Sequence, residues 1–332
     1  TGVEIAALRG PATREIDAGG AAVTPGFNDA HVHFLSGSLS LANVNLLAAE
    51  KLGQIEQAIR DFAAANPTVP WVLGRGWLYG AFPGGMPTRQ QLDALVPDRP
   101  AAMSCYDGHT LWVNSKALAL AGITRDTPDP PNGSIVRDPR TGEPTGALKE
   151  AAQSLVDAVI PQPTREEKLA ALKRGVVEAH RFGVTSIQEA GVSVEDLALF
   201  DTLSRTGGFP LRAYIAIQVA SGWTARDADR LDSLRSAHHD TPMLRLGMIK
   251  LYADGVIEAH TASMLAPYAN APTIGNPEMT AAEMARIVAL MDARGWQIQI
   301  HAIGDAGIRM SLDAFAAAAA ANPAPARGRR HR

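Results

Sequence analysis

Cysteine is almost absent from this 332-residue chain, which carries Cys105 as its single thiol. One cysteine excludes an internal disulfide and any cluster of thiolate ligands, so a metal site would have to use histidine, carboxylate or less usual ligands. Excess charge is also lacking, since a net charge of −3 gives no electrostatic case for binding nucleic acid or an anionic membrane. No apolar run is long enough to span a bilayer. The composition, 46% hydrophobic and 20% charged, is that of a globular protein with one large domain and an insert, or with two domains.

Two histidines, His31 and His33, follow a Pro25-Gly26 turn and are separated by one apolar residue. Alternate side chains of a β-strand share one face, so both imidazoles would project together while Val32 points the other way. Asp29 has the same parity and is a candidate for orienting a ligand or the substrate. Two imidazoles on one rigid face suit a transition metal such as zinc. The alternative is an ordinary strand whose histidines are satisfied by hydrogen bonds.

Strands and helices alternate regularly over residues 161–332. Thr164 and Thr280 each begin a predicted helix with a glutamate three residues later, the pattern of a capping box. The predicted strands cover residues 184–188, 211–219, 244–252 and 296–301, and the predicted helices cover residues 164–181, 193–205, 224–238, 280–293 and 305–320. This alternation favours a parallel βα architecture, and a site at the strand C-termini favours a barrel over an open sheet.

The earlier part of the chain divides by composition. Residues 1–24 are predicted to form short strands, as part of a composite β-sandwich, and residues 25–67 to form the first part of the barrel, with a helix over 48–65. Residues 68–160 are dense in proline and glycine and are predicted to form an inserted, loop-rich subdomain before the barrel continues over 161–332. Within the insert, short strands are expected at 71–74 and 101–104 and a helix at 114–120.

A polar and aromatic stretch, residues 106–114, lies inside the predicted insert. We expect it to contact the substrate through His109 and Asn114, with Trp77 and Trp112 as walls of an apolar pocket. The alternative is a turn whose histidine and asparagine only cap neighbouring backbone.

Two later strands end in side chains suited to a site. In residues 296–301 strict alternation turns Ile298 and Ile300 towards outer helices, and His301 towards the interior at the strand's C-terminal end. Lys250 lies inside an apolar strand, where a lysine is costly unless it is paired or chemically altered. Carbamylation by CO2 would convert its amine into an anionic oxygen ligand able to bridge two metal ions. The alternatives are a snorkelling or ion-paired lysine and a hydrogen-bonded core histidine.

Taken in order, residues 25–33, 107–115, 249–255 and 301–305 resemble the amidohydrolase superfamily. The nearest resemblance is to amidohydrolase family three, the branch that includes N-substituted formamide deformylases. It implies an α/β fold with a TIM-type (β/α)8 barrel, a flanking small β-sandwich and a divalent metal centre. It also implies metal-ligand roles for His31, His33, Lys250, as the bridging carbamylated lysine, and His301.

The resemblance also implies features that this chain lacks. Family members continue with a further histidine on the next strand and an aspartate after the last strand, which binds metal and relays the proton. The chain ends at Arg332, where that next strand should begin, so we expect a sequence clipped at both ends and a barrel without its last strands. His331 is not assigned a ligand role, and no other aspartate is assigned as the proton relay.

The function implied is hydrolysis of a non-peptide carbon–nitrogen bond by metal-activated water, with one or two divalent ions, zinc first among them. A related barrel hydrolase acting on esters or phosphotriesters, and an inactive fragment without a full metal shell, remain as alternatives. We expect a small-molecule substrate, a cytoplasmic location and no nucleic acid or membrane partner, with a homo-oligomer as an open option.

Overall fold

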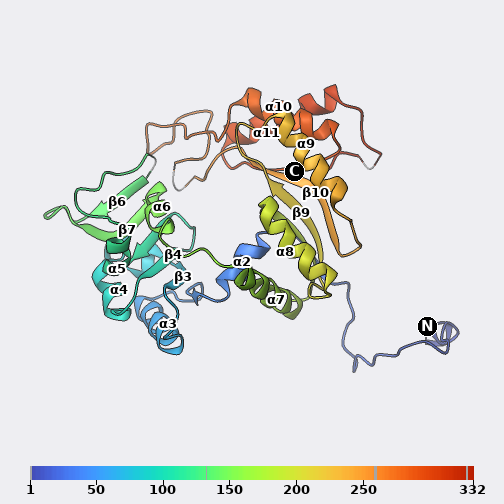
Figure 1. Cartoon of the computed structure of the whole chain (residues 1–332), viewed down its shortest axis with the longest axis horizontal. Coiled ribbons are helices and arrows are strands. Elements are labelled where there is room, and N and C mark those ends of the chain that lie inside the picture. Colours follow the sequence, from blue (N-terminus) through green and yellow to red (C-terminus); the bar gives the residue numbers. More distant parts are fainter. Residues whose placement is uncertain (1, 132, 258–259, 327) are drawn as a thin grey trace.

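Two β-sheets organise the computed structural model, which describes residues 2–131, 133–257, 260–326 and 328–332. A sheet of five strands and a sheet of six strands form two units that lie side by side, on the right and on the left of Figure 1. Each sheet has its own apolar core, so the chain contains two packed units joined by the segments on either side of the six-stranded sheet.

The five-stranded sheet is parallel throughout, in the order β1-β8-β9-β10-β11. Its strands are β1 (Phe27–Val32), β8 (Val184–Val192), β9 (Arg212–Gln218), β10 (Leu244–Tyr252) and β11 (Gln297–His301). Its helices are α2 (Phe34–Ser40), α7 (Arg165–Arg181), α8 (Val194–Arg205), α9 (Ala225–Ala237), α10 (Ala281–Ala293) and α11 (Asp305–Ala321). The predicted α/β class and parallel βα order are therefore confirmed. No helix in the described part of the chain has the length and apolar character needed to cross a membrane.

The predicted helix starts differ in one detail. Thr164 and Glu167 form the reciprocal capping box that begins α7. Thr280 accepts the backbone N–H of Glu283 at the start of α10, but the Glu283 carboxylate accepts the backbone N–H of Gly222. A tertiary contact has therefore replaced half of the second box.

The outer edge of β11 is lined by the last described residues. Ile300 donates its backbone N–H to the Arg332 carbonyl at 2.7 Å, and Arg332 donates to the Ile298 carbonyl at 3.0 Å. The His331 ring lies at this edge, where its Nδ1 accepts the backbone N–H of Ile298 at 3.1 Å and its Nε2 is 2.9 Å from Asp292 Oδ1. In the described residues β1 and β11 do not pair with each other, so the parallel sheet is open where the expected eight-stranded barrel would be closed.

The six-stranded sheet is mixed, in the order β2-β3-β4-β5-β7-β6. The strands are β2 (Val44–Asn45), β3 (Val72–Trp77), β4 (Ala101–Cys105), β5 (Thr110–Val113), β6 (Gly133–Arg137) and β7 (Pro144–Glu150). Four α-helices accompany it, α3 (Leu52–Ala65), α4 (Arg89–Leu95), α5 (Ser115–Leu120) and α6 (Ser154–Asp157), with 3-10 turns η1 (Tyr79–Ala81), η2 (Pro83–Gly85) and η3 (Ala151–Gln153).

This unit adds detail to the predicted insert. Strands β3 and β4 and helix α5 lie where short strands and a helix are expected, and the aromatic and apolar residues pack against α3, α4 and α5 in the cores of the mixed sheet. The helix expected in the first part of the barrel is α3, and its buried Ile55 and Ile59 pack in the core of the mixed sheet. The range 25–67 therefore divides, with β1 and α2 on the parallel sheet and β2 and α3 on the mixed sheet.

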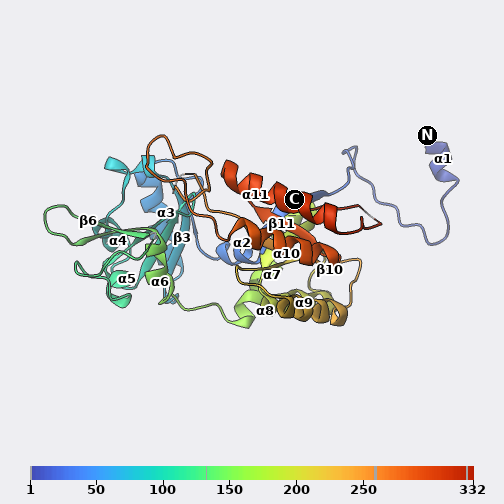
Figure 2. The ribbon, with the colours of Figure 1, turned by 90° about the horizontal axis from the view of Figure 1, so that it is seen from above.

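The N-terminal segment also differs from the expectation. Residues 3–8 were predicted as a strand, whereas the chain forms helix α1 (Gly2–Ala6) and then runs without a described strand up to Phe27. Ile5 and Leu8 are 70% and 83% exposed, and Figure 2 shows this segment extending away from both sheets. A strand needs a neighbour to satisfy its backbone groups, and here local bonds such as Leu8 N–H to Ile5 O satisfy them. The described residues 2–24 thus hold no strand that would belong to the expected β-sandwich.

Helices α2 and α7 meet at a glycine. A Cβ atom added to Gly175 would overlap the Ser38 hydroxyl and would lie 2.9 Å from Ser38 Cβ and 3.1 Å from the Phe34 ring. Gly175 therefore sets how closely α2, the helix that begins after His33, lies against α7.

Gly175→Ala should destabilise the protein by about 1 to 3 kcal/mol, because the added methyl group has no room between two packed helices. Gly53→Ala in α3 is the matched control, since an added Cβ there meets nothing within 4 Å and alanine favours helix by about 0.5 to 1 kcal/mol. Urea unfolding of both variants measures the difference. Equal stabilities would show that the two helices have room to separate.

Candidate metal centre

The parallel sheet brings His31, His33, Lys250 and His301 into one electrostatic cluster. His31 lies in β1, and His33 lies just beyond it, with the two ring centroids 5.6 Å apart. Lys250 in β10 is paired in register with Gln299, two residues before His301 in β11. The Gln299 side chain reaches His31 Nδ1, and the Lys250 charge lowers the pKa of both motif histidines, so residues more than 200 positions apart in the chain lie near one another at this end of the sheet.

Both histidines of the His-x-His motif favour the neutral form. Burial lowers the pKa of His31 and of His33 below the ordinary value of 6.5, and the nearby Lys250 cation lowers each further. Around neutral pH the imidazoles are therefore uncharged. This is the form of histidine that binds a metal ion.

The ring of His301 is oriented by backbone. Its Nε2 lies 3.0 Å from the Gly255 carbonyl oxygen, which can only accept a hydrogen bond. Nε2 is therefore the donor, and in the neutral ring Nδ1 keeps its lone pair for a ligand. A hydrogen bond from the other ring nitrogen to a backbone carbonyl is a usual way to hold a metal-binding histidine.

Gln299 plays the corresponding part for His31. The side-chain amide lies 2.5 Å from His31 Nδ1, and Gln299 Oε1 is buried without a hydrogen-bond partner among the described residues. Amide oxygen and nitrogen are assigned from hydrogen bonding. With the amide rotated by half a turn, the orphaned oxygen accepts the Nδ1–H of His31 and leaves Nε2 free. The alternation of residues 296–301 places Gln299 inside, but its role depends on the strand pairing that brings it to His31.

Lys250 is buried without a counter-ion. It is 1% exposed, its Nζ lies 4.9 Å from the centre of the Tyr252 ring, and no described carboxylate is within ion-pair distance. Burial lowers the pKa of Lys250 to about 8, with a smaller contribution from Arg332. The snorkelling and ion-paired alternatives do not describe this side chain among the described residues. With a pKa of about 8, most of its amines are charged and a minority are neutral near physiological pH.

The donor set fits a divalent transition metal in part. No three His, Cys, Asp or Glu side chains of the described residues stand close enough to hold an ion by themselves. The cluster instead offers the imidazoles of His31, His33 and His301, of which His301 is oriented by the Gly255 carbonyl, and the buried Lys250 amine, which has no counter-ion among the described residues. Imidazole ligands suit zinc, copper, iron and nickel, so the residues fit such an ion when Lys250 contributes a ligand atom.

Three predicted substrate contacts are core residues instead. Trp77 and Trp112 are fully buried in the mixed sheet, and their indole N–H groups donate to the Met103 and Thr88 carbonyls. Asn114 is also fully buried, where it caps α5. Its amide oxygen accepts the backbone N–H groups of Ala101 and Ala117, and its nitrogen donates to the Val96 and Arg99 carbonyls. These side chains have no capacity left for a substrate, so the capping alternative holds for Asn114.

His109 is placed differently, and its contact with the substrate stays a prediction. Its ring is half-buried, with Nδ1 3.1 Å from Glu150 Oε2, and its backbone N–H donates to Asp107. Glu150 has a φ of 50°, which is uncommon for a residue with a side chain. In the described part of the chain His109 makes no contact with the histidines of the parallel sheet.

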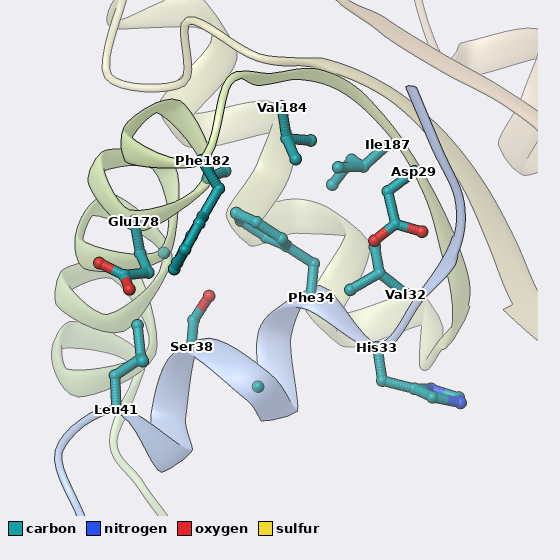
Figure 3. Close-up of a pocket in the computed structure, with 13 residues that line it drawn as sticks. Asp29, Val32, His33, Phe34, Ser38, Leu41, Glu178, Phe182, Val184 and Ile187 are labelled. Atoms are coloured by element: carbon teal, nitrogen blue, oxygen red, sulfur yellow. The ribbon is translucent and has the colours of Figure 1, made fainter. Parts of the chain in front are cut away.

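An apolar cavity of about 210 Å³ lies between β1, α2 and α7. Figure 3 shows Phe34, Phe182 and Val184 directed into it, while the His33 ring points away from it. Lys250 and His301 are absent from its lining. This cavity therefore lies between the sheet and its helices, and of the four residues of the cluster His33 alone contributes to its lining.

Glu189 is a buried carboxylate that the sequence did not single out. It lies in β8, is 1% exposed, and receives backbone N–H groups from Phe34 and Leu35. Burial raises its pKa to about 7, although these hydrogen bonds act in the opposite direction. A single charged residue in a strand that otherwise carries no charge is the sequence signal that would have found it.

Glu189→Gln should change the pH dependence of stability. The pKa of Glu189 is higher in the folded protein, about 7, than the ordinary value of 4.5, so the folded state binds this proton more tightly. Its stabilising effect is present at low pH and is lost as the pH rises towards 7. The free energy of unfolding of the wild type, relative to the variant, should fall by about 2 to 3 kcal/mol between roughly pH 5 and pH 8. Urea unfolding of both chelated proteins measures this, and a constant difference would contradict it.

Comparison with known proteins identifies relatives of the chain and of its fold. Residues 14–332 match the model of the amidohydrolase family. The chain is 30% identical over 318 residues to YtcJ of Bacillus subtilis, described as an amidohydrolase, and covers 57% of that protein. It is 25% identical to the N-substituted formamide deformylase of Arthrobacter pascens, of which it covers 60%. These matches take in 92% and 96% of this chain.

Among solved structures, an uncharacterized metal-dependent hydrolase from Pyrococcus horikoshii matches with a TM-score of 0.65 and 27% identity. The match covers 88% of this chain and 56% of that one. The chain thus spans a little over half the length of these relatives. A family match over nearly all of its residues, on a parallel βα sheet with the His-x-His motif at the end of β1, shows that the chain belongs to amidohydrolase family three.

Proposed function

We propose that the protein is a metal-dependent hydrolase that cleaves a non-peptide carbon–nitrogen bond, and that His31, His33, Lys250 and His301 hold its one or two divalent ions, zinc first among them. The observation that carries the proposal is that Gln299, the register partner of Lys250, contacts His31, so that the His-x-His motif lies near a buried lysine without a counter-ion among the described residues. The deformylase among its relatives, at 25% identity, supports an amide-like substrate. The relatives compared above are longer than this chain. We therefore propose the activity for a protein in which the barrel is closed as a (β/α)8 barrel.

Each residue of the cluster has a role in this proposal. His31 and His33 bind through neutral imidazoles, and His301 binds through the nitrogen left free by its bond to Gly255. The neutral amine of Lys250 attacks the carbon of CO2, forms an N–C bond and releases one proton, which leaves a carbamate anion. A divalent ion at such a site supplies Lewis-acid chemistry, namely activation of water and polarisation of a carbonyl. No described carboxylate is assigned the proton transfer.

Loss of either motif histidine should abolish tight metal binding. Purified wild-type chain, loaded with zinc and desalted, should retain metal, whereas His31→Ala and His33→Ala should weaken zinc binding by more than about 100-fold, since even residues that only support ligands cost 10- to 100-fold. Elemental analysis gives the metal per chain. His180→Ala on α7 is the control, because its ring contacts the Pro210 carbonyl on the outer layer. Full metal content in both variants would contradict the assignment of His31 and His33 as metal ligands.

A substrate panel separates carbon–nitrogen hydrolysis from its alternatives. The zinc-loaded protein should hydrolyse N-substituted formamides faster than the matched formate esters or aryl phosphotriesters. Lys250→Ala should lower the rate for every substrate by at least about 100-fold if it is a ligand. Preference for esters or phosphotriesters would move the protein to that class of hydrolase. A metal-loaded, compact chain without activity on any of them would identify the inactive-fragment alternative.

A further inference from the structure

Helix α2 begins directly after His33 and lacks an ordinary cap. His33 occupies the N-cap position, where a short polar side chain usually accepts the first free N–H groups of the helix. The His33 side chain makes no such hydrogen bond. The acceptor comes from the neighbouring strand β8, where Glu189 Oε2 lies 2.8 Å from the Phe34 nitrogen and 3.1 Å from the Leu35 nitrogen. The histidine is thereby free to face the cluster while the carboxylate satisfies the helix.

The site of Glu189 argues against a role in general stability alone. The carboxylate is 1% exposed and faces no described cation, and its partners are backbone amides. Burying a carboxylate without a counter-ion is costly. In register, Glu189 is the β8 partner of Val32, the residue between the two motif histidines. The buried Glu189 carboxylate, with its free-energy cost, therefore lies beside the turn where the chain leaves β1 at His33.

A second buried carboxylate repeats this arrangement after His301. Asp254 follows β10 and is 2% exposed. Its Oδ1 accepts the backbone N–H of Ile303 at 3.0 Å, and its Oδ2 accepts those of Gly304 and Ser263 at 2.8 Å each. Gly304 is the N-cap residue of α11 and has no side chain with which to cap it.

The segments that contain Asp254 and Ser263 pack closely against the start of α11. A Cβ atom on Gly307 would lie 2.8 Å from Asp254 Cγ, and one on Gly304 would lie 2.5 Å from the Ser263 carbonyl carbon. The residue after Asp254 is Gly255, whose carbonyl orients the His301 ring. Asp254 thus fixes both the segment that leaves His301 and the segment that holds its ring.

We propose that Glu189 and Asp254 are positioning residues of the metal centre, each holding the backbone that follows a ligand histidine by hydrogen bonds from a neighbouring strand. This inference rests on the proposed metal-binding function. The two carboxylates differ in a useful way. Glu189 uses one oxygen for both helix amides, so a glutamine keeps that acceptor. Asp254 uses both oxygens, so an asparagine must turn an NH2 group towards a backbone N–H.

The variants are chosen from this difference. Glu189→Leu keeps the volume and removes the acceptor, whereas Glu189→Gln restores it, and Asp254→Asn is nearly isosteric but leaves one oxygen. Asp93→Asn is the matched control, because Asp93 anchors the start of α5 through the backbone and hydroxyl of Ser115, with no ligand histidine beside it. Its effects should be confined to stability.

Two measurements follow on the full chain. In the chelated protein, amide hydrogen exchange at Phe34 and Leu35 should speed up at least about 10-fold in Glu189→Leu, and exchange at Ile303 and Gly304 likewise in Asp254→Asn. In cobalt titrations, Glu189→Leu and Asp254→Asn should lose roughly 10- to 100-fold in affinity and change the visible spectrum of the bound ion. Glu189→Gln and Asp93→Asn should stay within about 3-fold of wild type in the same titrations.

The outcomes separate the two proposals. A wild-type chain that binds no cobalt refutes the metal-binding function, while the exchange data still test the two hydrogen-bond networks. A wild-type chain that binds cobalt, with unchanged affinity and spectrum in Glu189→Leu and Asp254→Asn, overturns the positioning role alone. If Glu189→Leu does not fold, the other two variants decide. Weaker cobalt binding by Asp254→Asn together with unchanged cobalt binding by Glu189→Gln supports the inference. Any other result overturns it.

Discussion

Burial of the Lys250 amine without a counter-ion is the constraint on which the site depends. A lysine inside an apolar strand is stable only if its charge is reduced or its chemistry altered, and here burial brings its pKa to about 8. The Lys250 charge also acts on the groups around it. The same cation helps to keep His31 and His33 neutral, and the Tyr252 ring is the group that faces it. Burial is the larger cause of the lowered pKa of His31 and of His33, and the Lys250 cation adds to it.

Parallel strand pairing converts this constraint into a site. Parallel strands present their C-terminal ends on one edge, so chemistry placed at the ends of β1, β10 and β11 meets there although the residues are far apart in sequence. The strands position the side chains that they carry, and the segments that follow the strands must also be held in place. Glu189 and Asp254 tie two of those segments to neighbouring strands, which is why buried carboxylates occur beside a cluster that is otherwise cationic or neutral.

The mixed sheet shows how the same residue types can mean different things. Tryptophans beside a polar, glycine-rich stretch suggested a pocket, but Trp77 and Trp112 close the core between the sheet and its helices. Asn114 has the residue type of a substrate contact and the geometry of a helix cap. Composition does not distinguish these cases, because burial depends on which face of the strand meets another element.

The features that could be predicted from the sequence depend on residues that are close together in the chain. The period of the strands, the capping box at Thr164, the shared face of His31 and His33 and the inward face of Lys250 and His301 all follow from neighbours along the chain. The pairing of strands is a long-range property, and it alone decided that α3 belongs to the mixed sheet, that Glu283 bonds Gly222, and that Gln299 reaches His31. The sequence by itself determined the family, and the tertiary structure decided which buried groups contact the candidate site residues.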